Sequence, residues 1–378
     1  MIKAFISPAS LLVGTTIGAG IFSLPYVFAK SGLFLGILYL IVLSAVAFII
    51  HLLYADIVVR TYESRHRFPG YAKMYLGKYG ESFANFIVFT TLILILTVYL
   101  ILSVSFTGLI FPQIPEYFKI FIFWILGSIT LLLGIKKEVF FESFTTALTI
   151  FIIFVVFGFG FFSRAPQVFH LPIIDMKNFF LPLGPVLFSL IAPTSIPPLV
   201  VYFKNENLDV SRIKKIVFWG TILPALFYLL FVLGISWLSQ NISQDSVSGL
   251  IGYVKPLFLT LLGVFGFVSL WDSYASVGED IRKIIKYDWN LSAITGIIIV
   301  LFAPLALYFL GLQNFLKLVG FVGGVLMAVW SLLIIAIWVK ARRKECPQKI
   351  LDKINLPLIY LVVIILMGAI AYEIISFV

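Results

Sequence analysis

The sequence predicts an all-α integral membrane protein with 11 transmembrane helices, ten of them in two inverted repeats of five. Three observations predict this fold. Of the 378 residues, 61% are hydrophobic and only 12% are charged, whereas about a quarter of the residues in soluble domains are charged. The apolar residues gather in 11 stretches long enough to cross a bilayer. The first and the sixth stretch each carry helix-breaking residues near the middle.

The distribution of basic residues predicts the orientation. With the N-terminus inside, six of the 27 lysines and arginines fall in outer connections and the others fall in inner ones, which is the asymmetry of the positive-inside rule. We therefore expect a multi-pass protein of the cell (plasma or inner) membrane, with a cytoplasmic N-terminus and an extracytoplasmic C-terminus. The net charge of +10 is explained by topology and predicts no nucleic-acid partner. The bilayer itself is the expected surrounding, and the sequence leaves the oligomeric state open.

We expect a single transmembrane domain over residues 1–378. Residues 1–164 form the first five-helix repeat, residues 182–340 the second, and residues 355–376 an additional helix. The 11 predicted segments lie near residues 6–30, 33–59, 83–111, 117–135, 142–163, 182–203, 215–239, 254–277, 291–311, 316–339 and 355–376.

The first segment is a poor continuous helix. Residues 14–20 hold three glycines and two threonines, and Pro25 follows; glycine disfavours the helix interior. A break at this depth leaves backbone N–H and C=O groups unpaired unless they line a protein-enclosed cavity. We therefore expect an interrupted helix that lines a binding site.

Two polar features follow near the inner end of the second segment. His51 and Asp56 are expected at the membrane interface. Residues 68–78 mix basic and aromatic side chains, which is typical of a basic interfacial connector or a short amphipathic helix.

The sixth segment, like the first, carries helix-breaking residues near its middle. Residues 188–198 hold three prolines and three hydroxyl side chains, and proline removes a helical hydrogen bond. The breaks begin 175 residues apart, at Gly14 and Ser189. An odd number of segments separates their starts, so the second half begins on the opposite face. This is the pattern of an inverted-repeat secondary transporter.

The eighth segment carries the other polar cluster. Ser269, Asp272 and Ser273 are spaced i, i+3 and i+4, so they share one helix face. An ionisable residue inside a span is by default a functional hypothesis. Asp272 either belongs to a coupling-ion site, binding Na⁺ or carrying a proton, or reaches the inner interface and pairs with a basic side chain.

Half-helices that end near the midplane present free amides and free carbonyls. The amides around Gly18, Ala19 and Gly20 suit a carboxylate, and the carbonyls around Gly14 and Ile17 suit a cation. Tyr99 lies in the middle of the third segment, from which it either reaches the cavity or faces lipid and other helices. The candidate substrate-binding residues are Thr15, Thr16, Gly18, Ala19, Gly20, Tyr99, Ser189, Ala192, Thr194 and Ser195, and the candidate coupling-ion residues are Gly14, Ile17, Ser269, Asp272 and Ser273.

The stretch GTTIGAGIFSLP at residues 14–25 resembles the G-x-x-I-G-x-G-I-x-x-L-P opening of amino acid permeases. The resemblance is closest to the aromatic and hydroxy amino acid (tryptophan/tyrosine) permeases of the amino acid–polyamine–organocation superfamily. Ser195-Ile196-Pro197 and the stretch from Asp272 to Tyr274 are similar to further family motifs. The sequence departs from the family in having Ala192-Pro193 in place of a glycine and an aromatic residue, and Asp272 in place of threonine.

This resemblance implies a LeuT-like 5+5 core. It also implies a substrate carboxylate at residues 18–20, faced by residues 189–195, and a sodium-like site formed by Gly14, Ile17, Ser269, Asp272 and Ser273. The expected function is ion-coupled amino acid transport by alternating access, with Na⁺ or H⁺ as the coupling ion and no other cofactor.

Two alternatives stay open, and two others are set aside. One is a permease-like nutrient sensor, similar to subunits of germination receptors, and another is a transporter of a different small solute such as a nucleobase. The Asp-Pro-Gly-Asn motif and the methionine of metal-transporting relatives are missing from the breaks. No Walker A, zinc-ligand or Ser/His/Asp pattern is present, so we expect no enzymatic activity.

Overall fold

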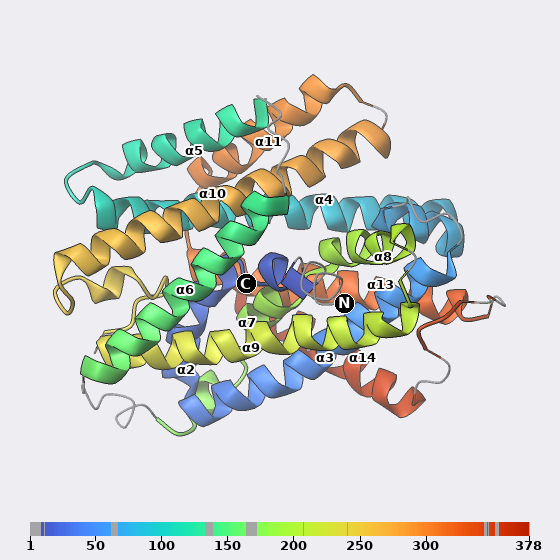
Figure 1. Cartoon of the computed structure of the whole chain (residues 1–378), viewed down its shortest axis with the longest axis horizontal. Coiled ribbons are helices and arrows are strands. Elements are labelled where there is room, and N and C mark those ends of the chain that lie inside the picture. The colour runs from blue at the N-terminus through green and yellow to red at the C-terminus, as the bar shows by residue number, and fades with distance from the viewer. Residues whose placement is uncertain are drawn as a thin grey trace.

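The computed structural model is an elongated bundle in which most helices run along one common direction (Figure 1). It describes residues 9–10, 12–61, 67–132, 139–163, 172–206, 208–239, 241–289, 291–343, 346, 348–351 and 355–377. Every regular element in these ranges is helical. The all-α class predicted from the sequence is therefore confirmed.

The α-helices keep the order of the predicted segments. They are α2 (Leu24–Ser31), α3 (Leu33–Arg60), α4 (Phe68–Ile110), α5 (Glu116–Leu132), α6 (Val139–Ser163), α7 (Leu183–Leu190), α8 (Ile196–Asn205), α9 (Ile213–Leu238), α10 (Pro256–Tyr287), α11 (Ala293–Phe309), α12 (Phe315–Phe321), α13 (Ala328–Ala341) and α14 (Leu356–Phe377). Short 3₁₀ turns are η1 (Ala19–Ser23), η3 (Met176–Asn178), η4 (Pro193–Ser195), η5 (Val210–Arg212) and η6 (Ser248–Leu250), and η7 (Val322–Met327) is a π-helix that joins α12 to α13.

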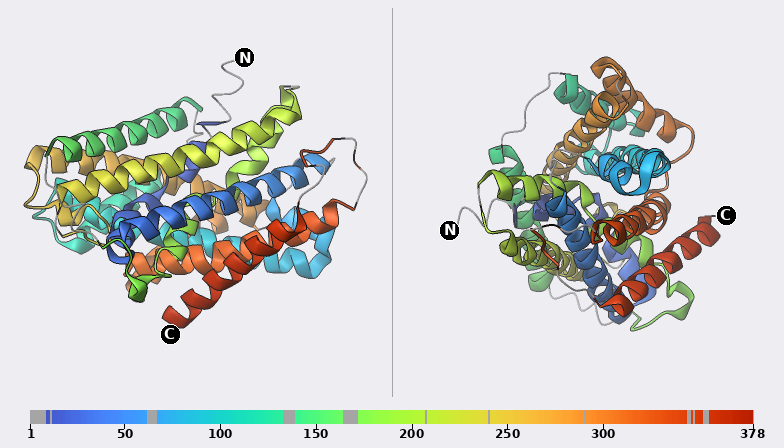
Figure 2. Two further views of the ribbon diagram at one scale, coloured as in Figure 1. Left: turned by 90° about the horizontal axis from the view of Figure 1, so that it is seen from below. Right: turned by 90° about the vertical axis from the view of Figure 1, so that its right-hand side faces the viewer.

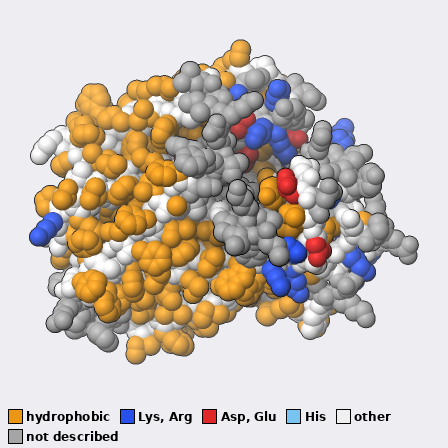
Figure 3. Space-filling model, viewed as in Figure 1, with side chains coloured by type: hydrophobic (Ala, Val, Ile, Leu, Met, Phe, Trp, Pro, Cys, Tyr) orange, Lys and Arg blue, Asp and Glu red, His pale blue; other side chains and the backbone are white. Residues whose placement is uncertain are grey.

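Hydrophobic length supports a multi-pass membrane protein. Among the described residues, eight helical stretches of at least 18 residues are apolar enough to cross a membrane, and Ile294–Phe309 is a shorter apolar helix. Hydrophobic side chains cover most of the face in Figure 3, and charged side chains gather at one end of it. A broad apolar belt with charge at an end is the surface that a bilayer requires.

The connector expected at residues 68–78 is the first part of α4. Pro69 stands at the start of the helix, where a missing N–H costs nothing. Gly77 interrupts the helix with φ 80° and ψ −171°, a conformation that glycine adopts without strain. The chain therefore forms a short helix at this end of the bundle and then turns into the long apolar part of α4.

Packing places the central helices around the two interrupted stretches. α10 lies along α4, and α6 lies along α9. Phe22 of η1 makes edge-to-face contacts with Phe106 of α4 and Phe231 of α9, with ring centroids 4.9 Å and 5.5 Å apart. In Figure 2, α14 lies at the edge of the bundle, where it packs on α12, η7 and α13.

Asp56, expected near the inner interface, is fully buried within the protein. Its carboxylate accepts hydrogen bonds from Arg60 at 2.7 Å, from the Trp338 indole at 2.8 Å and from the backbone N–H of Ile350 at 2.8 Å. A buried carboxylate is stable when its oxygens are satisfied in this way. Asp56 thus fastens the connection after α13 to α3, which is a structural role.

Candidate functional site

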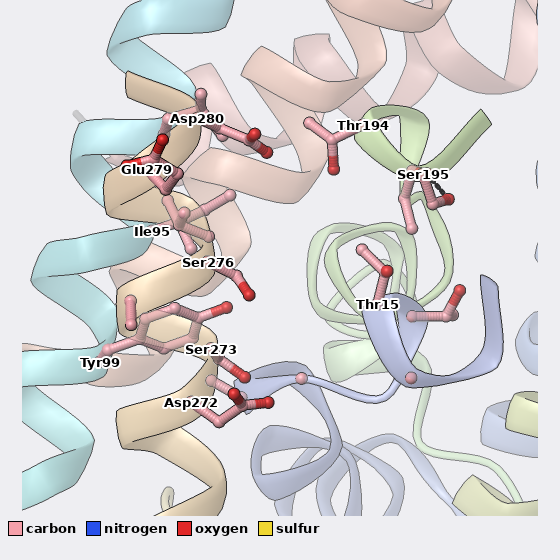
Figure 4. A pocket seen from close by; sticks show the side chains of 18 of the residues that line it. Thr15, Ile95, Tyr99, Thr194, Ser195, Asp272, Ser273, Ser276, Glu279 and Asp280 are labelled. Atoms are coloured by element: carbon pink, nitrogen blue, oxygen red, sulfur yellow. Dashed lines mark hydrogen bonds between the residues drawn. The ribbon is translucent and has the colours of Figure 1, made fainter. Parts of the chain in front are cut away.

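A cavity of about 760 Å³ lies between the interrupted stretches and helices α4 and α10. In Figure 4, Thr15 and Thr194 stand on one side of it and Tyr99, Asp272, Ser273 and Ser276 on the other. The cavity extends along α10 as far as Glu279, Asp280, Arg282 and Lys283. It therefore reaches from the middle of the bundle to the end where α10 carries its charged residues.

The first stretch leaves helical geometry at Ile17 and Gly18. Residues 12–16 are helical, and the Thr16 hydroxyl donates to the Leu12 carbonyl at 2.7 Å. Gly18 is extended, with φ −112° and ψ −156°, and η1 begins after it without a side-chain cap. The first N–H groups of a helical turn have no partner within it. The Gly18 N–H donates to the Thr16 carbonyl at 2.9 Å, so the donors that this start of η1 offers to an anion in the cavity are the N–H groups of Ala19 and Gly20.

The second stretch leaves helical geometry at Ile191 and Ala192, between α7 and η4. Pro193 brings no N–H group, and the Ser195 hydroxyl donates to the Ala192 carbonyl at 2.7 Å. Pro197 and Pro198 fall in the first turn of α8, where proline is tolerated. The three prolines thus end one helix and begin the next, and residues 191–195 line the cavity.

One side chain of α9 contacts both interrupted stretches. The fully buried Tyr228 hydroxyl lies 2.6 Å from the Thr16 carbonyl oxygen and 2.7 Å from the Ser189 carbonyl oxygen. The Thr16 carbonyl also accepts from the Gly18 N–H at 2.9 Å, outside the helical pattern. The Ser189 carbonyl has Pro193 at the position that would normally donate to it, and proline has no N–H. Tyr228 therefore ties the first break to the second.

Replacement of Tyr228 by phenylalanine is expected to destabilise the protein. The change removes only the hydroxyl, whose single hydrogen is shared between the two carbonyls. The Thr16 carbonyl still accepts from the Gly18 N–H at 2.9 Å, but the buried Ser189 carbonyl is left short of a donor, which costs about 1–3 kcal/mol. The measurement is the thermal unfolding temperature of the purified protein. Tyr360 of α14 is 64% exposed, so Tyr360→Phe is the matched control and should unfold at the wild-type temperature. Equal unfolding temperatures for both variants would contradict the bridging role.

His51, expected at the interface, is fully buried within the bundle. Its Nε2 atom accepts a hydrogen bond from the Ala192 backbone N–H at 3.1 Å. Its Nδ1 atom lies 3.2 Å from the Thr221 hydroxyl, which donates its own hydrogen to the Val217 carbonyl. Nδ1 must therefore carry the proton, and the neutral ring holds the second break against α3 and α9.

The cluster on α10 is joined to α6. The Thr145 hydroxyl donates to the Asp272 carboxylate at 2.8 Å, and the Thr149 and Ser269 hydroxyls lie 3.1 Å apart. Asp272 and Ser273 line the cavity, whereas Ser269 points to α6. The shared helix face predicted from the spacing is thus divided between the cavity and the helix interface.

The structure brings most of the predicted site residues to one cavity. The candidates that line it are Gly14, Thr15, Thr16, Gly18, Ala19, Gly20, Tyr99, Ala192, Thr194, Ser195, Asp272 and Ser273. Three candidates do not line it. Ile17 and Ser189 are buried, with the Ser189 hydroxyl donating to the Pro185 carbonyl at 2.7 Å, and Ser269 bonds to α6.

A model of the tryptophan/tyrosine permease family matches residues 1–375 of this chain. The chain belongs to that family. This permease is 22% identical over 356 residues to glutamine transporter 2 of Aliivibrio fischeri, with 90% of each chain covered.

Solved structures of transporters share the fold of this permease. MhsT in complex with L-phenylalanine matches with a TM-score of 0.68 and 15% identity, covering 98% of this chain and 97% of its own. MHP1, a nucleobase-cation-symport-1 family transporter, matches with a TM-score of 0.67 and 14% identity, and the match covers 99% of this chain and 91% of MHP1. A mutant of the manganese transporter of Eremococcus coleocola matches with a TM-score of 0.63 and 12% identity, and the match covers 98% of this chain and 94% of the transporter. The predicted LeuT-like permease is thereby confirmed, and these relatives are transporters rather than enzymes.

Sequence reasoning missed four side chains of this permease that surround the site. They are His51, Thr145, Thr149 and Tyr228. One sequence feature could have identified the threonines, because Thr145 and Thr149 are spaced i, i+4, which places their hydroxyls on one helix face. The partners of His51 and Tyr228 lie far away in sequence, so no local pattern identifies them.

Proposed function

We propose that this permease is an ion-coupled symporter that moves a neutral amino acid across the cell membrane by alternating access. One observation carries the proposal: both interrupted stretches border the same cavity as the Asp272 carboxylate. A substrate and a coupling ion bound there would contact the same non-helical backbone, which is how the two are coupled in transporters of this architecture. The names of the glutamine and phenylalanine-bound relatives support an amino acid as substrate.

The proposed substrate pose follows from the polar groups of the cavity. The uncapped start of η1 at residues 18–20 receives the carboxylate. The side chain then lies between the hydroxyl groups of Thr15 and Thr194 on one side of the cavity and those of Tyr99, Ser273 and Ser276 on the other. Hydroxyls donate and accept hydrogen bonds, so we propose a neutral amino acid with a polar side chain.

The proposed coupling-ion site is centred on Asp272. Its carboxylate and the Ser273 hydroxyl face the cavity, which Gly14 also lines. Oxygen ligands from a carboxylate, a hydroxyl and backbone carbonyls suit Na⁺, and the carboxylate alone suffices for H⁺. The Thr145 hydroxyl orients the carboxylate from the other side, at 2.8 Å.

The proposed topology has 11 spans in a 5+5+1 arrangement, with the first and sixth spans broken near the midplane. The repeats are residues 1–164 and 182–340, followed by the helix at 355–376. With the N-terminus in the cytoplasm, the end of α10 at Asp280 and Lys283 is cytoplasmic. The cavity then opens inward, and the conformation is the one that releases substrate into the cell.

A ligand screen tests this function. The purified permease is heated with single amino acids or nucleobases, with and without Na⁺ and at two pH values, and its unfolding temperature is followed. A ligand that binds only the folded state stabilises it and so raises the unfolding temperature. At a ligand concentration of a hundred times its Kd, the gain in the free energy of unfolding is about 2.7 kcal/mol. We expect stabilisation by a polar neutral amino acid and enhancement by the coupling ion.

A second measurement separates a transporter from a sensor. The stabilising amino acid, radiolabelled, should accumulate in liposomes that contain the permease and an imposed ion gradient. Stabilisation by a nucleobase alone would favour a substrate like that of MHP1. Binding of the amino acid without accumulation would favour a nutrient sensor, and both results contradict the proposal.

A further inference from the structure

Glu373 is a buried carboxylate that does not line the cavity beside Asp272. It lies on α14, the helix at the edge of the bundle, and it is only 7% exposed. No lysine or arginine in the described part of the chain lies within ion-pair distance of it. An unpaired ionised carboxylate is costly inside a protein and costlier inside a membrane.

Three glycines form the pocket that receives this carboxylate. A Cβ added at Gly320 would lie 2.9 Å from Oε2 and 3.1 Å from Oε1 of Glu373. A Cβ at Gly184 or at Gly324 would also collide with the Glu373 side chain. The pocket is therefore made by the backbone of α7, α12 and η7, and any larger residue would fill it.

The pocket belongs to elements that lead to the transport cavity. α7 ends at Leu190, directly before the second interrupted stretch. A Cβ at Gly323 of η7 would lie 2.6 Å from the Phe188 backbone nitrogen, so η7 and α7 pack backbone to backbone. The π-helical turns of η7 (Val322–Met327) are a form that recurs at functional sites. Glu373 thus contacts the half-helix that precedes the break.

The polar surroundings favour a protonated carboxyl. The Glu373 Oε1 atom and the Gly320 carbonyl oxygen both lie against the face of Gly184. An ionised carboxylate and a carbonyl oxygen are both acceptors and cannot hydrogen-bond to each other, whereas a protonated carboxyl can donate. The Ser376 hydroxyl, next to it on α14, donates to the Glu373 carbonyl at 3.1 Å.

The other titratable groups near this pocket do not supply a counter-charge. α7 and η7 carry no titratable side chain. α12 carries Lys317, which is exposed, and α14 carries Tyr372, whose ring lies 5.6 Å from that of Phe180. Tyr39 of α3 lies beyond Tyr372 and interacts with it. Protonation is the remaining way to neutralise the carboxylate.

We propose that Glu373 is a second proton-binding site of the permease, separate from the Asp272 site, whose protonation seats α14 on α7 and η7. A proton from water adds to the carboxylate oxygen, and the neutral carboxyl occupies the glycine pocket. When the carboxyl deprotonates, the proton passes to water, and the ionised Glu373 carboxylate that remains does not fit the glycine pocket. The occupancy of this site therefore controls how firmly the half-helix before the second break is held.

The test measures the unfolding temperature of the purified permease from pH 5 to pH 9, because this readout does not depend on transport. A proton held more firmly in the folded than in the unfolded chain stabilises the protein at low pH. This stability is lost as the pH rises and the proton leaves, by up to about tenfold in the unfolding constant per pH unit. We expect Glu373→Gln, which is permanently neutral, to lose this decline.

Glu116 is exposed at the start of α5, so Glu116→Gln is the matched control and should keep the wild-type decline. A Glu373→Gln variant that also keeps the wild-type decline would overturn the proposal. If Glu373→Gln is not recovered as folded protein, Glu373→Asp takes its place. We then expect the decline to move to a different pH, and an unmoved decline would overturn the proposal. A failed ligand screen would leave these outcomes unchanged, so the two proposals fail separately.

Discussion

Replacement of Gly18 by leucine is expected to abolish substrate uptake while the protein stays folded. The Gly18 backbone is extended, with φ −112°, which leucine adopts without strain. A Cβ at this position meets only the Tyr99 hydroxyl, at 3.6 Å, so the side chain must project into the cavity. Overfilling a packed site costs about 1–3 kcal/mol, which is about tenfold to hundredfold in binding.

The measurement is the initial uptake rate in cells or liposomes, together with the amount and unfolding temperature of the protein. Gly368 lies on the exposed face of α14, and a Cβ there meets nothing within 4 Å. Gly368→Leu is therefore the control and should transport normally. Wild-type uptake by Gly18→Leu would refute the placement of the substrate beside residues 18–20.

Gly20→Leu should also abolish uptake, but for a different reason. A Cβ at Gly20 would lie 2.8 Å from the Ser189 Cα and 2.9 Å from the Phe188 ring. Backbone cannot yield as the end of a side chain can, so this variant should lose stability as well as uptake. The two glycines are equivalent in the sequence motif but have different roles in the structure. Gly18 leaves space for a ligand, and Gly20 lets η1 approach the end of α7 closely.

The membrane fold was predictable because a bilayer constrains the sequence so strongly. A segment that crosses lipid must be apolar over its whole length and hydrogen-bonded within itself, so the helices follow from composition alone. The breaks at residues 17–18 and 191–192 were visible for the same reason. Glycine and proline violate the rule there, and such a violation is tolerated only around a cavity.

The contacts that support the site were not predictable. An apolar helix such as α3 or α9 shows no periodicity that separates its buried face from its lipid face, because both are hydrophobic. A histidine or tyrosine in such a helix therefore gives no sign of its direction. His51 was assigned to the interface on this account, although it binds the Ala192 amide 141 positions away. Only the packed structure shows which polar side chains meet.

Replacement of Asp272 by asparagine is expected to abolish ion-driven accumulation of the substrate. Asparagine has nearly the shape of aspartate, so the Thr145 hydroxyl keeps an acceptor 2.8 Å away, but the negative charge is lost. Hydrogen bonds to a charged group are worth about 1.5–3 kcal/mol, and the loss of a charged ligand should weaken ion binding at least about tenfold. The measurement is uptake against an imposed Na⁺ or H⁺ gradient, compared with substrate binding in its absence.

Asp280 offers a matched control, because it lies on the same helix two turns nearer the charged end and also lines the cavity. It is 3.8 Å from Lys283, so its charge already has a partner. Asp280→Asn should retain gradient-driven accumulation. Unchanged dependence on Na⁺ and pH in Asp272→Asn would rule out Asp272 as the ion ligand.

A substitution of Thr145 distinguishes two roles for Asp272: an ion ligand held in position by the threonine, or only a nearby negative charge. If the threonine orients the carboxylate, Thr145→Val should weaken ion dependence in the wild-type background and have no further effect in Asp272→Asn. Such non-additivity is the mark of two residues that act through one interaction. Additive losses would mean that Thr145 serves the packing of α6 on α10 instead. The side chain that sequence reasoning overlooked would then have no part in coupling, and the ion would be held from the cavity side alone.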